Sequence, residues 1–261
     1  MNNLTKIIII ILIVILIYTN FNFKNIEKFS QVQKSNQSSN QKSNQNLNIK
    51  TESDKNKGDI PKIIHQTAPK DLSKWRPEWY SCYNTWKQNF PKSEYKHVMW
   101  YDEDLENLIK NDFPWFYPLY MSYDKKIKKI DIARYFILYK YGGIYADMDY
   151  MCTKNFYDLI PKNIVSISES PFKENEYIQN ALMISPPKCE FWMKVIKEAI
   201  GRMDETDVLN STGPKLLSDI YFKNMNEVNV LSEKLFNPRK DTLDFYSDDI
   251  ITKHLGTVSW M

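Results

Sequence analysis

Two carboxylates separated by one residue are the first feature of this sequence that could do chemistry. Asp147 and Asp149 stand in the run GGIYADMDY, residues 142–150. In an extended backbone the side chains of residues i and i+2 point to the same face, so we expect the two carboxylates to converge at the end of a strand. Hard oxygen ligands in that arrangement suit Mn²⁺ or Mg²⁺, which can bridge a nucleotide diphosphate and neutralise charge on the leaving group.

An Asp-x-Asp pair taken alone does not establish a functional site. A solvated turn after a strand would show the same residues at the same spacing. A metal-dependent phosphohydrolase of the haloacid dehalogenase type also places Asp-x-Asp after a strand, but it has Thr or Val two residues beyond the second Asp. This chain has Met151 at that position, which disfavours a phosphohydrolase.

A second charged pair lies shortly upstream. Asp131 and Arg134 are three residues apart, which places them on neighbouring positions of one helix face. An ordinary ion pair within the helix would account for them. Because this helix leads directly to the strand before Asp147, both side chains could also point into the same cleft. Asp131 would then accept hydrogen bonds from sugar hydroxyls, and Arg134 would donate to sugar or phosphate oxygens.

Alternating strand and helix patterns surround these residues and must position them. Runs rich in β-branched and aromatic residues predict strands at 60–67, 94–102, 143–146, 163–170 and 177–185. Apolar residues at helical spacing predict helices at 103–111, 126–140, 188–201 and 214–224. Gly142 and Gly143 end the second of these helices. The alternation predicts an α/β fold with helices packed on the faces of a sheet.

The N-terminal part of the chain differs in composition from the rest. Residues 7–23 are uncharged and mostly apolar, and as a helix they would span roughly 26 Å, which is just long enough to cross a bilayer. No small-x-small cleavage site follows, so we expect an uncleaved signal anchor at 1–24 rather than a cleaved signal peptide. The polar, low-complexity segment 25–58 predicts a disordered stem, and 59–261 is then the catalytic domain.

Charge and cysteine usage exclude some classes of function. The net charge of +3 is uneven, because residues 1–57 carry +5 and the remainder about −2. A mildly acidic body argues against nucleic-acid binding. Cys82, Cys152 and Cys189 have no CxxC spacing, so neither a zinc site nor a disulfide framework is indicated, and we expect buried or free thiols.

A run of lysines precedes Asp131. Lys125, Lys126, Lys128 and Lys129 lie within DKKIKK, residues 124–129. The simplest interpretation is a solvated helix face, and contact with an anionic membrane surface is the functional alternative.

The whole arrangement resembles the family 32 glycosyltransferases with an Asp-x-Asp signature, which include inositol-phosphoceramide mannosyltransferases and α-1,6-mannosyltransferases. The similarity covers about residues 60–261, through the segments IPKIIHQT, DIARYFILYKYGGIYADMD, NALMISPP, STGPKLL and HLGTVSW. The resemblance implies a GT-A-type nucleotide-sugar-binding fold with a mixed central sheet. It also implies a nucleotide-sugar donor, a divalent metal (Mn²⁺ or Mg²⁺) and retention of the anomeric configuration.

The resemblance also implies roles for individual residues. The catalytic residues would be Asp131, Arg134 and Asp149. The metal ligands would be Asp147, Asp149 and His254. The nucleotide sugar would contact His65, Asp131, Arg134, Tyr145, Asp147, Ser259 and Trp260.

Two of these assignments have structural alternatives. His65 ends the first strand and could equally be a buried core histidine. Ser259 and Trp260 would donate hydrogen bonds to the diphosphate as a closing flap, whereas chain ends usually tolerate deletion. A weaker similarity to clostridial glucosylating toxins, which have a C-terminal Ser-Trp or Ser-x-Trp element, supports the flap.

We therefore predict a metal-dependent retaining hexosyltransferase, with mannose as the favoured sugar. Its partners would be a nucleotide-sugar donor, a glycolipid or glycan acceptor, and a membrane reached through the N-terminal helix, with the catalytic head in the lumen of the secretory pathway. A non-catalytic sugar-binding protein of the same fold and a metal-dependent phosphohydrolase are the alternatives.

Overall fold

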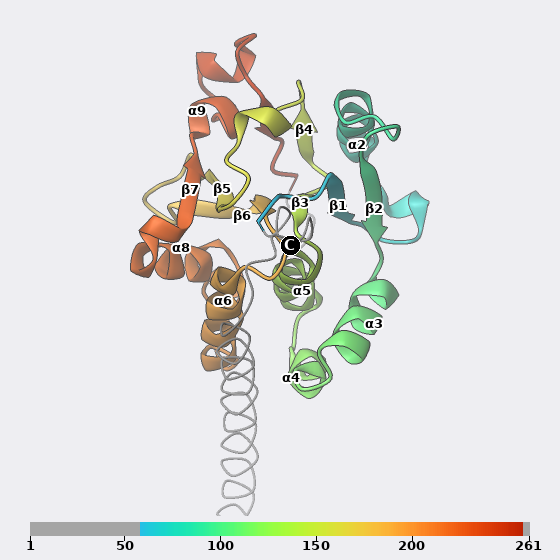
Figure 1. Cartoon of the computed structure of the whole chain (residues 1–261), viewed down its shortest axis with the longest axis vertical. Coiled ribbons are helices and arrows are strands. Elements are labelled where there is room, and N and C mark those ends of the chain that lie inside the picture. The colour runs from blue at the N-terminus through green and yellow to red at the C-terminus, as the bar shows by residue number, and fades with distance from the viewer. Residues whose placement is uncertain (1–57, 258–261) are drawn as a thin grey trace, which may run out of the picture. The chain divides into compact units, whose positions relative to one another are not determined.

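The computed structural model describes residues 58–257 (Figure 1). The predicted anchor at 1–24, nearly all of the predicted stem at 25–58, and Ser259 with Trp260 lie outside the described residues, so these assignments remain predictions. Between residues 58 and 257, no helix combines the length and the apolar character that a membrane crossing requires.

A six-stranded sheet forms the centre of the described part, in the order β2-β1-β3-β6-β5-β7. Its strands are β1 (Ile63–Thr67), β2 (Lys96–Trp100), β3 (Gly143–Ala146), β5 (Val165–Glu169), β6 (Ile178–Ser185) and β7 (Val228–Leu231). β1 pairs in parallel with β2 and β3, and β5 pairs in parallel with β7. β6 runs antiparallel to both β3 and β5. The sheet is therefore mixed, and the five predicted strands are confirmed.

The helices of the described part are α2 (Pro77–Asn89), α3 (Asp102–Asp112), α4 (Tyr117–Ser122), α5 (Lys126–Tyr141), α6 (Glu190–Gly201), α7 (Val208–Ser211), α8 (Pro214–Lys223) and α9 (Glu233–Phe236). Short 3₁₀ turns occur at Leu72–Lys74, Tyr157–Leu159, Met225–Glu227 and Leu243–Tyr246. The four predicted helices correspond to α3, α5, α6 and α8. Helix α2 was not predicted, although Trp79, Cys82 and Trp86 form its buried face at helical spacing.

Different helices cover the two faces of the sheet. Ile64 of β1 points to the side of α2, where it joins Trp86 and Phe90 in one apolar cluster. His65, the next residue of β1, points to the opposite side and reaches the end of α5. On that side α6 packs against both α5 and α8 (Figure 1). Successive side chains of β1 point to opposite faces of the sheet. Ile64 therefore points into the core, and His65 points towards α5, the helix that carries Asp131 and Arg134.

A second, two-stranded sheet joins segments that are far apart in the sequence. β4 (Tyr150–Cys152) pairs antiparallel with β8 (Thr252–His254), and Tyr150 lies opposite His254. The indole N–H of Trp86 in α2 donates to the carbonyl oxygen of Tyr150 at 2.6 Å. This small sheet brings the C-terminal end of the described chain beside Asp149, the residue that precedes β4.

Two consecutive glycines let α5 turn sharply into β3. Gly142 and Gly143 have φ angles of 62° and 91°, in the left-handed region where an L side chain is strained. A Cβ atom on Gly143 would lie 2.6 Å from the carbonyl oxygen of Ile63. The absence of a side chain therefore lets β3 begin directly against β1.

His65 is buried beside the end of α5, and its assignment to the nucleotide pocket stays a prediction. Its Nε2 atom lies 3.0 Å from the carbonyl oxygen of Gly142, and its Nδ1 atom accepts a hydrogen bond from the indole N–H of Trp100 at 3.1 Å. These contacts place the ring hydrogen on Nε2 and link β1 to β2 and to the end of α5. Burial lowers the pKa of His65 to about 4, so the ring is neutral at pH 7.

Replacing Gly143 with alanine should destabilise the fold, because the new Cβ would meet the Ile63 carbonyl in a strained backbone conformation. We expect the free energy of unfolding, measured by denaturant titration, to fall by about 3 kcal/mol. Gly201→Ala at the end of α6 is the matched control, since no atom lies within 4 Å of its Cβ position. Equal stability of the two variants would contradict the close approach of β3 to β1.

The buried neutral His65 should make stability depend on pH. Its pKa is lowered from 6.5 to about 4 on folding, so its contribution is complete above pH 6.5 and is lost as the pH falls towards 4. The difference corresponds to about 3 kcal/mol. We expect unfolding titrations of His65→Gln to show a correspondingly smaller loss of stability between pH 7 and pH 4 than the wild type. Parallel losses in the two proteins would contradict a neutral buried His65.

Candidate functional site

A cavity of about 880 Å³ lies where β1 and β3 end and β6 begins. Helix α5 forms one wall, and the segment before β4 and the end of β8 contribute to another. The cavity is lined by five of the predicted site residues, namely Asp131, Arg134, Asp147, Asp149 and His254. Residues separated by more than a hundred positions therefore share one site.

A turn, rather than strand alternation, brings the two carboxylates together. β3 ends at Ala146, and the backbone N–H of Tyr150 donates to the carbonyl oxygen of Asp147 at 3.0 Å. The backbone N–H of Asp147 is held in turn by the carbonyl oxygen of Ala181 at 2.9 Å. The expected convergence is present, but strand alternation does not produce it, because the chain turns at Met148 and Asp149.

Asp147, Asp149 and His254 form a group that could hold a metal ion. One ligand atom of each residue lies within 4.8 Å of the other two. Two carboxylates with one imidazole suit Mn²⁺, and carboxylate oxygens also suit Mg²⁺. The donor set therefore fits the divalent ion that the sequence predicted.

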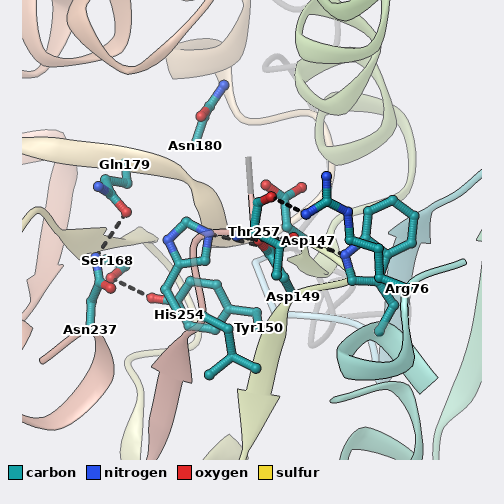
Figure 2. A network of polar contacts seen from close by, with 12 residues as sticks. Arg76, Asp147, Asp149, Tyr150, Ser168, Gln179, Asn180, Asn237, His254 and Thr257 are labelled. Atoms are coloured by element: carbon teal, nitrogen blue, oxygen red, sulfur yellow. Dashed lines mark hydrogen bonds and ion pairs between the residues drawn. The ribbon is translucent and has the colours of Figure 1, made fainter. Parts of the chain in front are cut away.

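Asp149 is the most strongly hydrogen-bonded of the three (Figure 2). Its Oδ2 atom accepts from the backbone N–H of Thr257 at 2.7 Å and from the Thr257 hydroxyl at 3.0 Å. Its Oδ1 atom lies 3.3 Å from Nε2 of His254. Burial alone would raise the pKa of Asp149, but the hydrogen bonds from His254 and Thr257 outweigh it and hold that pKa below its usual range. Asp149 is therefore ionised at neutral pH.

The pairing of β4 with β8 positions His254. Its ring stacks on the ring of Tyr150, with centroids 5.0 Å apart and planes 16° apart (Figure 2). Burial opposes protonation of the ring, but Asp149 and then Asp147 outweigh it and raise the pKa of His254. A metal ion at this position would take the place of that proton, because histidine binds metals in its neutral form.

Tyr145 supports Asp147 and lies outside the set of described residues that line the cavity. Its fully buried hydroxyl donates to Oδ1 of Asp147 at 2.7 Å. The same hydroxyl lies 2.9 Å from the hydroxyl of Thr67 at the end of β1. Tyr145 therefore positions Asp147, and its contact with the nucleotide sugar stays a prediction.

Arg134 connects the metal-ligand group to Asp131. Its guanidinium lies 3.2 Å from Oδ1 of Asp131 through Nη1 and 3.2 Å from Oδ1 of Asp147 through Nη2. Nη1 also donates to the carbonyl oxygen of Asn180 at 3.2 Å. The buried Nε atom of Arg134 has no hydrogen-bond partner among residues 58–257.

Asp131 lies on the same wall of the cavity and is buried. It accepts hydrogen bonds from the side-chain amide of Asn180 at 3.1 Å and from the hydroxyl of Thr212 at 3.3 Å. Burial raises the pKa of Asp131 to about 7, against the opposing effect of Arg134. Asn180 was not predicted from the sequence, although an amide side chain in the otherwise apolar run NALMIS of β6 was a usable signal.

Thr257 is a second site residue that was not predicted from the sequence. Besides its two bonds to Asp149, its carbonyl oxygen accepts from the guanidinium of Arg76 at 2.6 Å. Its hydroxyl lies 3.0 Å from the indole nitrogen of Trp79, which donates to it. The backbone N–H of Leu255 donates to the carbonyl oxygen of Asp149 at 2.8 Å. These contacts hold residues 255–257 beside Asp149. The predicted flap residues Ser259 and Trp260 lie outside the described part.

Comparisons with known proteins agree with this site. Residues 76–166 match a family described as "Glycosyltransferase sugar-binding region containing DXD motif". An uncharacterized glycosyltransferase of Acanthamoeba polyphaga mimivirus is 31% identical over 223 residues, which cover 77% of this chain and 84% of that protein. Inositol phosphoceramide mannosyltransferase 3 of Schizosaccharomyces pombe is 42% identical over 169 residues, which cover 62% of this chain and 45% of that protein. This chain thus spans about half the length of that yeast relative.

The fold has a counterpart among solved structures. The PaToxG glycosyltransferase superposes with a TM-score of 0.52 at 18% sequence identity, over 65% of this chain and 71% of that chain. This likeness supports a GT-A-like fold, in agreement with the mixed central sheet.

If Asp147, Asp149 and His254 hold a metal, Mn²⁺ should stabilise the folded protein, because an ion that binds only the folded state shifts the unfolding equilibrium. We expect near-saturating Mn²⁺ to raise the melting temperature by about 5 °C or more in scanning fluorimetry. Asp149→Asn should abolish the shift. Asp102→Asn, which removes a cavity carboxylate outside the group, should retain it. A full shift in Asp149→Asn would place the ion elsewhere.

Proposed function

We propose that this chain, which belongs to the glycosyltransferase family whose sugar-binding region contains a DXD motif, transfers a hexose from a nucleotide sugar to a hydroxyl group of a glycolipid or glycan. One observation carries the proposal. Asp147, Asp149 and His254 come within 4.8 Å of one another in the same cavity that contains Asp131 and Arg134. Residues that could hold a metal ion beside a diphosphate are thus adjacent to residues that could bind a sugar through hydrogen bonds.

Mannose is the hexose that we propose. The support comes from relatives, since the matched proteins of Schizosaccharomyces pombe are named inositol phosphoceramide mannosyltransferases. Their names also favour a glycolipid acceptor that carries an inositol phosphate headgroup.

We assign the divalent ion to Asp147, Asp149 and His254. When bound, the ion would supply positive charge to the diphosphate leaving group. Arg134, which lines the same cavity, would add a second positive charge. Asp131 and Asn180 would accept hydrogen bonds from hydroxyl groups of the donor sugar.

We propose that the reaction retains the anomeric configuration. The acceptor hydroxyl would approach the anomeric carbon from the side of the departing diphosphate. The bond from that carbon to the phosphate oxygen breaks as the bond to the acceptor oxygen forms, and the acceptor proton passes to the departing phosphate. Asp131 is held by Arg134, Asn180 and Thr212, so we assign it to sugar binding and nominate no protein nucleophile.

We also propose a membrane location with the catalytic head in the lumen of the secretory pathway. The proposal rests on the uncharged segment 7–23 and on the lipid acceptors named for the yeast relatives. An anchored head would keep its site close to a lipid acceptor.

A screen of nucleotide sugars would test this function. We expect the purified full chain to release a nucleoside diphosphate from GDP-mannose faster than from other nucleotide sugars, in Mn²⁺ and not in EDTA. Asp149→Asn should reduce the release by about 100-fold or more, because it removes a ligand of the ion that stabilises the leaving group. Binding of nucleotide sugars without any release would indicate a non-catalytic sugar-binding protein. Phosphate release from simple phosphoesters would indicate a phosphohydrolase.

A further inference from the structure

The start of α2 lies beside the metal-ligand group. Arg76 is the residue before α2, and Trp79 is buried in the first turn of the helix. Trp79 lines the same cavity as Asp147 and Asp149. Two segments of the site contact these residues of α2, namely the turn that carries the two acids and the C-terminal segment 255–257.

Trp79 packs with the turn that carries the two carboxylates. Met148 is the residue between Asp147 and Asp149, and its side chain is 4% exposed. It forms a small apolar cluster with Trp79 and Ala68. Because removing this apolar side chain from water is favourable, the cluster holds the turn against α2.

Trp79 also contacts the C-terminal segment, through a hydroxyl group whose bonding direction is fixed. An ionised carboxylate only accepts hydrogen bonds, so the Thr257 hydroxyl donates its one hydrogen to Oδ2 of Asp149, at 3.0 Å. The indole nitrogen of Trp79 only donates, and its hydrogen goes to the Thr257 hydroxyl oxygen at 3.0 Å. These two bonds form a relay of hydrogen bonds that runs in one direction, from Trp79 through Thr257 to Asp149.

The backbone of Thr257 strengthens the same contact. Its N–H donates a second hydrogen bond to Oδ2 of Asp149 at 2.7 Å, and its carbonyl oxygen accepts from the Arg76 guanidinium at 2.6 Å (Figure 2). Both bonds from Thr257 to Asp149 therefore end on Oδ2. The other oxygen, Oδ1, lies 3.3 Å from Nε2 of His254. Two donors on Oδ2 fix the rotation of the carboxylate, with Oδ1 on the side of His254.

We infer that Thr257 and Trp79 are positioning residues for the divalent ion, a role that rests on the proposed function. The relay holds Oδ2 of Asp149 and leaves Oδ1, the oxygen beside His254, to bind the ion. The Trp79 side chain packs with Met148 and donates to Thr257, so it orders both segments that supply metal ligands. Hydrogen bonds of this kind, made to a ligand rather than to the ion, orient the ligand and raise the affinity for the metal.

Titration of the purified full chain with Mn²⁺ alone, in a nonionic detergent, tests this role without nucleotide or turnover. The electron paramagnetic resonance signal of the unbound ion measures the affinity. We expect Thr257→Val to weaken Mn²⁺ binding by about tenfold or more, because the hydroxyl that orients Asp149 is lost. Thr257→Ser keeps the hydroxyl and should bind Mn²⁺ as the wild type does. Unchanged affinity in Thr257→Val would overturn the positioning role, and so would an equal loss in Thr257→Ser.

Trp79→Phe tests the start of the relay, because it removes the indole N–H and keeps an aromatic ring. We expect weaker Mn²⁺ binding, with little further loss when this change is combined with Thr257→Val, since both residues act through one oxygen of Asp149. Two losses that simply add would overturn the relay.

Trp75→Phe is the matched control. Trp75 packs against the same apolar cluster, but its indole N–H donates to the carbonyl oxygen of Pro69 at 2.8 Å. We therefore expect Trp75→Phe to bind Mn²⁺ as the wild type does. A loss equal to that of Trp79→Phe would reduce the effect to a disturbance of the cluster and overturn the role of the indole N–H.

Amide hydrogen exchange tests the same contact in the absence of metal. The backbone N–H groups of Leu255 and Thr257 both donate to Asp149, the first to its carbonyl oxygen and the second to its carboxylate. We expect both amides to exchange about fivefold faster in Trp79→Phe than in the wild type, because the segment loses one of its hydrogen bonds. The exchange should be unchanged in Trp75→Phe. Unchanged protection in Trp79→Phe would contradict a role of Trp79 in holding the segment.

The release of nucleoside diphosphate from nucleotide sugars, measured on the same preparations, separates the positioning role from the proposed function. A wild type that binds Mn²⁺ and releases no diphosphate refutes the transferase function, whereas the positioning role is judged from the affinities and the exchange rates alone. A wild type that does not bind Mn²⁺ refutes the assignment of the ion and the positioning role together.

Discussion

Arg134 lies between two buried carboxylates, and the arrangement of the site depends on that contact. Its guanidinium is 3.2 Å from both Asp131 and Asp147. Burying charges is costly unless they are paired and hydrogen-bonded, and without Arg134 the two acids would face each other across a poorly solvated wall. Burial raises the pKa of Asp131 even with Arg134 beside it, as expected for a carboxyl group that is removed from water. Because the guanidinium neutralises part of this charge, both carboxylates can stay in the wall of the cavity, where a ligand could contact them.

The rest of the core holds this ion-pair network in place. Tyr145 and Thr67 fix Asp147 through a chain of hydroxyl groups. The paired glycines after α5 let β3 begin within contact of β1, and His65 ties that junction to β2. None of these supports needs to touch a ligand. Their role is to keep the end of β3 at one distance from the wall of α5, so that Arg134 reaches Asp147.

The C-terminal segment completes the site from outside the central sheet. Asp149 accepts two hydrogen bonds from Thr257, and β8 delivers His254 by pairing with β4. The segment is held in turn by Arg76 and Trp79, at the start of α2. The metal-ligand group therefore combines a central turn with a distant strand.

The sequence by itself determined the local features of this protein. Helical spacing at 126–140, the β-branched runs and the Gly142–Gly143 stop are short-range signals, and they identified α5, β3 and the order of the charged residues. It also predicted Asp131, Arg134, Asp147, Asp149 and His254 as site residues, partly through a family resemblance, and the structure places all five in one cavity. Only the tertiary structure decided which of the neighbouring residues face the cavity. The period-two pattern of the strands gives the face of the sheet to which His65 and Tyr145 point. It does not say whether a helix or the cavity covers that face. The roles of Asn180 and Thr257 likewise depend on contacts between elements far apart in the chain. The different surroundings of the four lysines at 125–129, of which Lys128 alone is buried, depend on such contacts as well. Local spacing carries no information about them.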